Sequence, residues 1–278
     1  MTGRYAAFTF CDRITRHVPA QRAEARFAIP GSLDLFASCL VAEATGQLAA
    51  WVAMAHVGFR SRPVAALANE TRYLRDVRPG ETLELAVDLE QCDEETVAYS
   101  GRASVAGTAV VELVDCVAPM LPQDEYDSAE DLARQFALLC GEGAAPGRFG
   151  GVPAHTLETV EDVPGTLRRA LLRVPDAAPF FADHFPRRPV YPATLMLDAA
   201  LAVAQAFVAG TGTAGTTWRP ARVTHVKMRD WTLPGQTVDI GVTPLAATAA
   251  GPRAAITARI GERTVATARA EFTAEAAS

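Results

Sequence analysis

An internal repeat is the feature that most constrains the fold. The segment Arg75–Leu89 (RDVRPGETLELAVDL) returns as Arg229–Leu245 (RDWTLPGQTVDIGVTPL), and their Pro-Gly pairs are 155 residues apart. The apolar segments LVAEA and LMLDA share this offset, which aligns Glu43 with Asp198. Self-similarity over such a period is typical of a repeated supersecondary unit. The chain is therefore predicted to contain two copies of one unit.

Each copy is predicted to contain a long apolar helix and several alternating strands. The helices, roughly 35–57 and 192–209, are apolar nearly all round, which is typical of central helices. ETLELAVDLE and TAVVELVDCVA in the first copy, and TVDIGVTPL and RTVATARAEFT in the second, alternate with the period of half-buried strands. The expected fold class is α+β, with a curled antiparallel sheet wrapped around one long central helix in each copy.

A polar segment separates the two copies. The expected boundaries are 1–122 for the first copy, 123–152 for a linker with a short helix, and 153–278 for the second copy. Ser128, followed three residues later by Asp131, is a candidate N-cap for the linker helix. The glycine cluster after it lacks the preceding strand and the following Lys-Ser/Thr of a phosphate-binding loop, so a flexible exit is expected.

Composition excludes several classes of protein. Hydrophobic residues make up 49% of the 278 residues, which argues against a disordered or collagen-like chain. A net charge of −6 argues against a nucleic-acid partner. The five cysteines form no CxxC pair and have no histidine at zinc-ligand spacing, which favours reduced intracellular thiols and no metal.

Neither a signal peptide nor a membrane span is expected. The N-terminal residues have no apolar core followed by a cleavage pattern. The longest apolar run, Pro192–Ala209, has Asp198 in its middle, which favours a buried helix over a membrane helix. The protein is therefore predicted to be cytoplasmic, with no membrane partner.

The two copies differ upstream of their helices. HVPAQRAEARFAIP (17–30) resembles DVPGTLRRALLRVP (162–175), but here the offset falls to 145 residues. Ten residues of the second copy are thus missing from the first, between Pro30 and Glu43. In the second copy this interval includes a histidine at position 184.

The segment PFFADHFPRRPVYPATLMLDA (179–199) resembles the β-hydroxyacyl-ACP dehydratases of fatty-acid synthesis, which have the hotdog fold. Their pattern has an aromatic pair, His-Phe-Pro, Pro-Val, a Met-Pro-Gly turn, and an acid fourteen residues after the histidine. The matching residues here are Phe180-Phe181, His184-Phe185-Pro186, Pro189-Val190, Tyr191-Pro192-Ala193 and Asp198. The resemblance is weaker over the rest of the second copy. The first copy shares the resemblance in three segments: FCDRI, EATGQ and the strand that follows its Pro-Gly pair. Two such units also resemble the double-hotdog dehydratases of polyketide and polyunsaturated fatty-acid synthesis.

The resemblance implies roles for individual residues. His184 would be the base that removes the α-proton, because a neutral imidazole suits this task near neutral pH. A carboxyl group on an apolar helix would hold the proton for the departing hydroxyl, since burial raises its pKa. The backbone N–H of Ala193, at the start of the second helix, would meet the thioester oxygen. Ala193 stands where the family has glycine, so its methyl group leaves less room for the thioester oxygen to approach this N–H.

In hotdog dimers of this family, the histidine and the acid of one site come from opposite hotdogs. Carried over to a tandem chain, His184 would face Glu43 of the first copy, with Gln47 as its orienting partner. Asp198 would face the missing histidine loop, and it is the fallback acid. Phe185, Tyr191 and Pro192 are the remaining substrate-positioning candidates implied by the motif.

Arginine pairs near the motif are candidates for carrier binding. Arg187 and Arg188, with Arg168 and Arg169, would suit an acidic acyl carrier protein or its phosphopantetheine arm, although such pairs are also common as solvated surface residues. The arm would arrive with the substrate carrier, so no cofactor of the chain itself is implied. Cys39 could line the site, and the four other histidines are expected to be structural or exposed, namely His17, His56, His155 and His225.

The resemblance implies a 3-hydroxyacyl-[acyl-carrier-protein] dehydratase, a hydro-lyase that forms a 2-enoyl thioester in polyketide or fatty-acid biosynthesis. One composite active site is expected between two tandem hotdogs. A hotdog acyl thioesterase is the first alternative, because such enzymes often work with a helix carboxylate. A non-catalytic partner subunit of a biosynthetic complex is the second. Chain length, stereochemistry, carrier protein versus coenzyme A, and further homodimerisation stay open.

Overall fold

The computed structural model describes residues 4–210 and 216–275. The outermost residues of the two predicted copies, 1–3 and 276–278, lie outside this range. The elements of the first half are β1 (Arg13–Val18), β2 (Arg22–Ala28), α1 (Ser38–His56), β3 (Ser61–Pro63), β4 (Leu67–Tyr73), β5 (Thr82–Cys92), β6 (Thr96–Val105) and β7 (Thr108–Pro122). The connection holds the short helix η1 (Gln123–Glu125) and α2 (Ala129–Cys140). The elements of the second half are β8 (Thr156–Val163), β9 (Leu167–Arg173), η2 (Pro179–Ala182), α3 (Ala193–Ala209), β10 (Trp218–Met228), β11 (Thr237–Thr248), β12 (Gly251–Ile260) and β13 (Arg263–Ala274).

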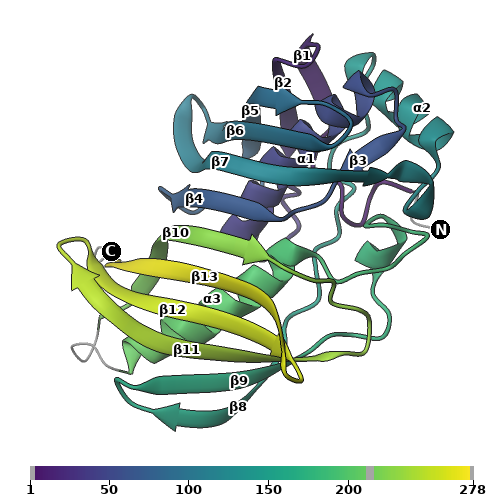
Figure 1. The fold of residues 1–278 in the computed structure, drawn as a ribbon. Coiled ribbons are helices and arrows are strands. Elements are labelled where there is room, and N and C mark those ends of the chain that lie inside the picture. Colours follow the sequence, from purple (N-terminus) through teal and green to yellow (C-terminus); the bar gives the residue numbers. More distant parts are fainter. Residues whose placement is uncertain (1–3, 211–215, 276–278) are drawn as a thin grey trace.

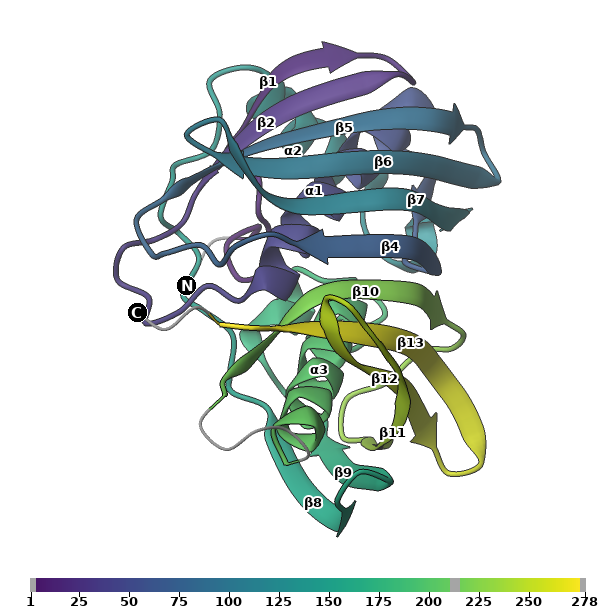
Figure 2. The same cartoon turned by 90° about the vertical axis from the view of Figure 1, so that its left-hand side faces the viewer.

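The strands form one antiparallel sheet that curls around α1 and α3, as Figures 1 and 2 show. Its order is β1-β2-β5-β6-β7-β4-β10-β13-β12-β11-β9-β8, and β3 pairs with the end of β7. Read outward from the centre, β4, β7, β6, β5, β2 and β1 match β10, β13, β12, β11, β9 and β8. The chain thus has a hotdog-like fold, with a large antiparallel sheet and few helices.

The two halves share a sheet and a core. Strand β4 pairs with β10 over residues 67–72 and 222–227, so the sheet continues from one half into the other. Helices α1 and α3 are in contact beneath this joint. One hydrophobic cluster includes buried side chains of both helices, such as Leu48 and Ala204. Burying the apolar surfaces of both helices against one sheet is the main driving force for this arrangement.

The predicted elements are confirmed with small changes in their ends. The apolar helices are α1 and α3, and the linker helix is α2, where the Asp131 N–H donates to the Ser128 hydroxyl at 3.2 Å. The connection from sheet to helix runs over 29–37 in the first half and over 174–192 in the second. The longer connection contains the histidine loop. No helix in the described part of the chain combines the length and apolarity that a membrane span needs.

Candidate functional site

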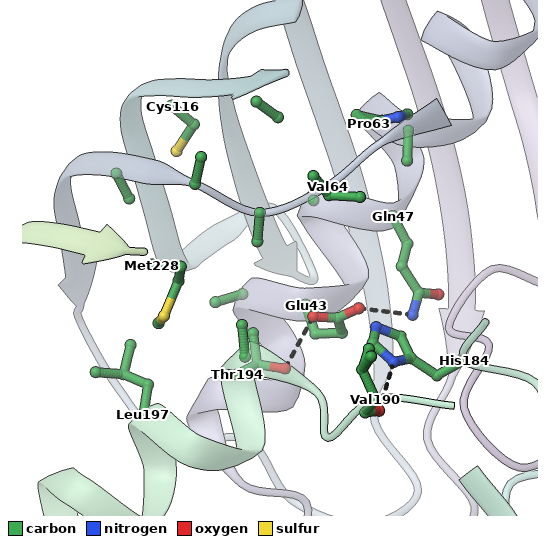
Figure 3. A pocket seen from close by; sticks show the side chains of 18 of the residues that line it. Glu43, Gln47, Pro63, Val64, Cys116, His184, Val190, Thr194, Leu197 and Met228 are labelled. Carbon is green, nitrogen blue, oxygen red and sulfur yellow. Dashed lines mark hydrogen bonds between the residues drawn. The ribbon is translucent and has the colours of Figure 1, made fainter. Parts of the chain in front are cut away.

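A cavity of about 250 Å³ lies where the two halves meet. Helix α1 contributes Glu43 and Gln47, and the loop before α3 contributes His184. Strand β7 contributes apolar residues, among them Leu113 and Ala118. Figure 3 shows the Glu43 carboxyl group and the His184 ring on facing sides of this space. A largely apolar pocket with a few convergent polar groups is typical of a binding or active site.

The geometry around His184 identifies the protonated ring nitrogen. Its Nδ1 lies 3.3 Å from the carbonyl oxygen of Val190 (Figure 3), and a carbonyl can only accept a hydrogen bond. Nδ1 is therefore the protonated nitrogen, and Nε2 keeps its lone pair. The Phe185 ring stacks on the imidazole at 4.1 Å between centroids, and Phe185 has φ +60°, a conformation that is costly for a bulky residue. The loop thus holds the imidazole with an acceptor nitrogen free.

His184 is neutral over the whole physiological range. Burial, and then the positive charge of Arg62, lower the pKa of His184 from 6.5 to about 3, while the hydrogen bond to Val190 opposes the shift. Desolvation disfavours the charged imidazolium, and a neighbouring cation disfavours it further. The His184 ring is therefore uncharged near neutral pH, with the lone pair of Nε2 available to accept a proton.

Glu43 is held by hydrogen bonds from both halves of the chain. Gln47 Nε2 donates to Oε1 at 2.9 Å, and the Thr194 hydroxyl donates to Oε2 at 2.9 Å (Figure 3). Burial raises the pKa of Glu43, although these two hydrogen bonds and the charge of Arg62 reduce the shift. A carboxyl group with a raised pKa keeps its proton nearer to neutral pH, which is what a general acid needs. Thr194 was not predicted as a site residue.

Gln47 also joins the helix to the N-terminal segment. Its side-chain oxygen accepts from the Phe10 N–H at 3.0 Å, and its Nε2 donates to the Phe8 carbonyl at 3.0 Å as well as to Glu43. The amide therefore cannot rotate without losing hydrogen bonds. The orienting role of Gln47 stays a prediction.

Residues 4–10, here called the N-terminal strap, cross over the histidine loop and were not predicted to contribute to the site. Asp183, next to His184, accepts hydrogen bonds from three backbone N–H groups of the strap: Tyr5 at 2.8 Å, Ala7 at 2.6 Å and Phe8 at 3.0 Å. The Phe8 ring also meets the His184 ring edge-on at 5.5 Å. The strap thus closes one side of the site and orients the loop that carries the histidine.

We expect Asp183→Ala to loosen the strap and reduce activity. Three N–H groups lose a charged acceptor, and one hydrogen bond to a charged group contributes roughly 1.5–3 kcal/mol net. Because these N–H groups are only partly buried, water replaces part of the loss, and we expect a net destabilisation of about 2 kcal/mol. The melting temperature should fall by on the order of 5 °C. Thermal denaturation checks this, with Asp88→Ala, at an exposed acid of β5, as the control. A melting temperature within 1 °C of wild type, roughly the change for an unimportant surface site, would contradict the role given to Asp183.

Asp198, the predicted fallback acid, is not among the residues that line the cavity. His155 Nε2 lies 2.8 Å from its carboxylate, and His155 Nδ1 lies 3.1 Å from the Tyr191 hydroxyl. Both ring nitrogens are therefore occupied, so this histidine has no free acceptor for proton transfer. His155 was expected to be structural or exposed, and these two hydrogen bonds give it a structural role beside Asp198. The connection before α1 is ten residues shorter than the one before α3 and carries no histidine loop that could face Asp198. His155 lies next to Asp198 instead.

The other residues implied by the motif surround the start of α3. Pro192 is the N-cap and Ala193 is the first residue of the helix. Ala193 lines the cavity together with Phe185 and Tyr191. The first N–H groups of a helix have no partner within it, and the helix dipole favours negative charge there. The N-terminus of α3 can therefore stabilise a developing oxyanion in the cavity. Cys39 lines the cavity too, but burial raises the pKa of its thiol and keeps it protonated.

The arginine pairs are engaged within the chain. Arg187 donates to the Asp124 carbonyl at 2.8 Å, and Arg188 lies 3.2 Å from Glu125. Arg168 pairs with Asp162, and Arg169 pairs with Glu161 and Asp239. Arg168, Arg169 and Arg188 are thus paired with carboxylates, and the role of the four arginines in carrier binding stays a prediction.

Comparison with known proteins relates the second half to one family. Residues 159–269 match the model of the FabA-like domain. A search of curated protein sequences finds no match for the chain.

Solved structures similar to the whole chain are described as acyl thioesterases or related proteins. The tesB protein of Mycobacterium avium subspecies paratuberculosis superposes with a TM-score of 0.61 at 14% identity, covering 94% of this chain and 95% of the other. A protein described as an oleoyl thioesterase of Lactobacillus plantarum gives 0.61 at 11% identity, with 92% and 97% covered. The 12:0-ACP thioesterase of Umbellularia californica gives 0.56 at 10% identity, with 94% and 100% covered. At these identities the similarity shows a shared fold.

Proposed function

We propose that the chain is a dehydratase that converts a carrier-bound 3-hydroxyacyl thioester into a 2-enoyl thioester. One observation carries the proposal: a neutral histidine with a free Nε2 and a carboxyl group of raised pKa line the same cavity. A pair of titratable groups whose environments separate their pKa values in this way suits one base and one acid.

In the first step, His184 Nε2 removes the proton from C2 of the bound thioester. The electron pair of the C–H bond moves toward the carbonyl, whose oxygen gains negative charge. The N–H of Ala193 and the N-terminal end of the α3 dipole stabilise this oxygen. The neutral starting state of His184 is required, because an imidazolium cannot accept the proton.

In the second step, the C3 hydroxyl leaves as water with the proton of Glu43. The electron pair returns to form the C2–C3 double bond, and Glu43 is left as a carboxylate. Transfer of the proton from His184 to Glu43 restores both groups. Gln47 and Thr194 hold the Glu43 oxygens in place throughout, so orientation is set before the substrate binds.

We place the two halves as tandem hotdogs, with 1–122 and 153–278 as the repeats and 123–152 as the linker. Their pseudo-symmetry would create two composite sites, of which only the one containing His184 has a histidine loop. An acyl carrier protein is the proposed donor of the substrate, and one structural neighbour is described as a 12:0-ACP thioesterase. The cytoplasm is the proposed compartment.

A thioesterase is the second candidate, because similar folds covering nearly the whole chain are described as thioesterases. In such a reaction His184 or Glu43 would activate water for attack on the thioester carbonyl. The raised pKa of Glu43 is less suited to a base than to an acid. The two functions give different products from one substrate.

Mass spectrometry of a 3-hydroxyacyl carrier protein incubated with the purified protein tests the proposal. Dehydration lowers the mass of the acyl carrier protein by one water. Hydrolysis instead releases the free acid and leaves the bare phosphopantetheine arm. Appearance of free acid without an enoyl product would favour the thioesterase, and no change with any acyl chain would favour a non-catalytic subunit.

The dependence of kcat/KM on pH should lack an acid limb near pH 6.5. Because the pKa of His184 is lowered to about 3, the base stays neutral as the pH falls through the range in which an ordinary histidine becomes protonated. Activity should instead fall as the pH rises through the raised pKa of Glu43, where the acid loses its proton. Initial rates over the pH range in which the protein stays folded check this. A limb near pH 6.5 would show that His184 is not held in the neutral state.

A further inference from the structure

Two polar atoms beside His184 are buried without a partner. Arg62 Nε and Tyr5 Oη are both inaccessible to solvent and make no hydrogen bond within residues 4–210 and 216–275. Both side chains line the cavity that contains Glu43 and His184. Arg62 comes from β3 and Tyr5 comes from the N-terminal strap, so separate segments bring them to one cavity.

Buried polar groups in folded proteins are almost always hydrogen-bonded, because an unsatisfied donor costs free energy. A charged donor is costlier still, and burial lowers the pKa of Arg62 from 12.5 to about 10. The guanidinium therefore stays charged at neutral pH, and its Nε–H has no partner among the described residues. This combination is expected where a ligand supplies the missing acceptor.

The charge of Arg62 is not used in an ion pair. Asp127, the acidic residue with the largest effect on Arg62, is bound by Arg4 instead, and Arg4 also pairs with Asp131. Among the residues that the structure describes, no carboxylate forms a salt bridge with Arg62. The cavity thus carries a positive charge that the protein leaves available to an oxygen atom.

Arg62 is close to the reacting groups. Its guanidinium carbon lies 4.1 Å from the centre of the Phe185 ring, and this ring is 4.1 Å from the ring of His184. If a substrate is held between His184 and Glu43, the atoms that lie near Arg62 are therefore those separated from the thioester group by only a few bonds. Strand β7, in contrast, lines the cavity with apolar residues such as Leu113 and Ala118.

We propose that Arg62, assisted by the Tyr5 hydroxyl, forms a binding subsite for an acceptor oxygen of the thioester substrate. The inference rests on the proposed function and adds a residue that determines specificity. The oxygen is a carbonyl or carboxylate oxygen within a few bonds of the thioester. Two sources share this chemistry: the first amide of the phosphopantetheine arm, and an oxygen carried further along the acyl chain.

Four small thioesters separate the two sources. The 3-hydroxyhexanoyl and 3-hydroxy-5-oxohexanoyl groups are each prepared as the N-acetylcysteamine thioester, which retains the arm amide, and as the S-pentyl thioester, which lacks it. Dehydration by wild type and Arg62→Met is then measured as kcat/KM. Arg62→Met should lower kcat/KM by about 10- to 100-fold wherever the recognised oxygen is present.

A loss confined to the N-acetylcysteamine thioesters assigns the oxygen to the arm. A loss confined to the 5-oxo substrates assigns it to the acyl chain, and either result supports the subsite. An equal loss on all four substrates overturns the subsite, because the guanidinium would then act on the fold or on His184 alone. No loss on any substrate also overturns it, because the guanidinium would then bind none of these oxygens. Tyr5→Phe removes one hydroxyl group with little change in shape, and it should show the same selectivity with a loss of about 3- to 10-fold.

A binding measurement keeps this test separate from the proposed function. Thioether analogues of the same four compounds, with the thioester carbonyl replaced by methylene, cannot react. Their Kd for wild type and Arg62→Met, measured by calorimetry, reports the subsite even if the wild type proves inactive as a dehydratase. Arg60→Met is the matched control, because Arg60 is an exposed arginine in the turn before β3 and pairs with Glu94 outside the cavity.

Discussion

Replacing His184 with alanine is expected to lower kcat for dehydration by roughly 10²- to 10⁴-fold, the range that a positioned general base contributes. The loss should fall on kcat more than on KM, because the imidazole acts on the proton at C2 and the apolar wall of the cavity is unchanged. Single-turnover formation of the enoyl product, followed by mass spectrometry, measures the chemical step directly.

His56→Ala is the matched control, because this histidine lies at the exposed end of α1. It should retain wild-type kcat within a few-fold. A His184→Ala protein that is folded, as shown by circular dichroism, and still dehydrates at the wild-type rate would remove His184 from the mechanism. Equal losses in both variants would indicate a general effect on folding.

The second large effect concerns which carboxyl group supplies the proton. Glu43→Gln should lower kcat by roughly 10²- to 10⁴-fold, because an amide of the same shape still accepts a hydrogen bond from Thr194 but has no acidic proton to give. Asp198→Asn should stay within a few-fold of wild type, because Asp198 does not line the cavity and is bound to His155. Rates of enoyl formation for the two variants, measured side by side, decide between them.

The reverse result would be informative. If Asp198→Asn were inactive and Glu43→Gln active, the acid would come from the same half as His184, and the cross-half arrangement would be wrong. Loss in both variants would require a second experiment, such as solvent exchange of the C2 hydrogen. That exchange needs only the base and should survive the loss of the acid.

Much of the fold could be predicted from the sequence because its signals are local or repeated. The Pro-Gly turns at 79–80 and 234–235, the alternating strands and the two apolar helices recur at one offset, and each follows from short-range geometry. The ten-residue difference upstream of the helices was visible in the same way. The pairing of His184 with Glu43 came from the resemblance to dimeric hotdogs, and the structure brings both side chains to one cavity.

Other parts of the site had no such signal, because they depend on contacts between segments far apart in the chain. Asp183 binds the N-terminal strap, Thr194 binds Glu43, and His155 binds Asp198. No periodicity or motif links these partners, since each pair meets only when the strap, the linker and the two halves pack together.

The sequence by itself determined the two central helices, the alternating strands and the chemical types of the candidate site residues, because these follow from residue periodicity and from one local motif. The tertiary structure decided which carboxyl group shares the cavity with His184, which one is hydrogen-bonded to His155, and that Arg62 lines the same cavity with an Nε–H that is unpartnered across the described ranges. The physical reason is burial: desolvation and long-range packing set the charge state and the free hydrogen-bonding capacity of a side chain, and both depend on neighbours that are distant in the sequence.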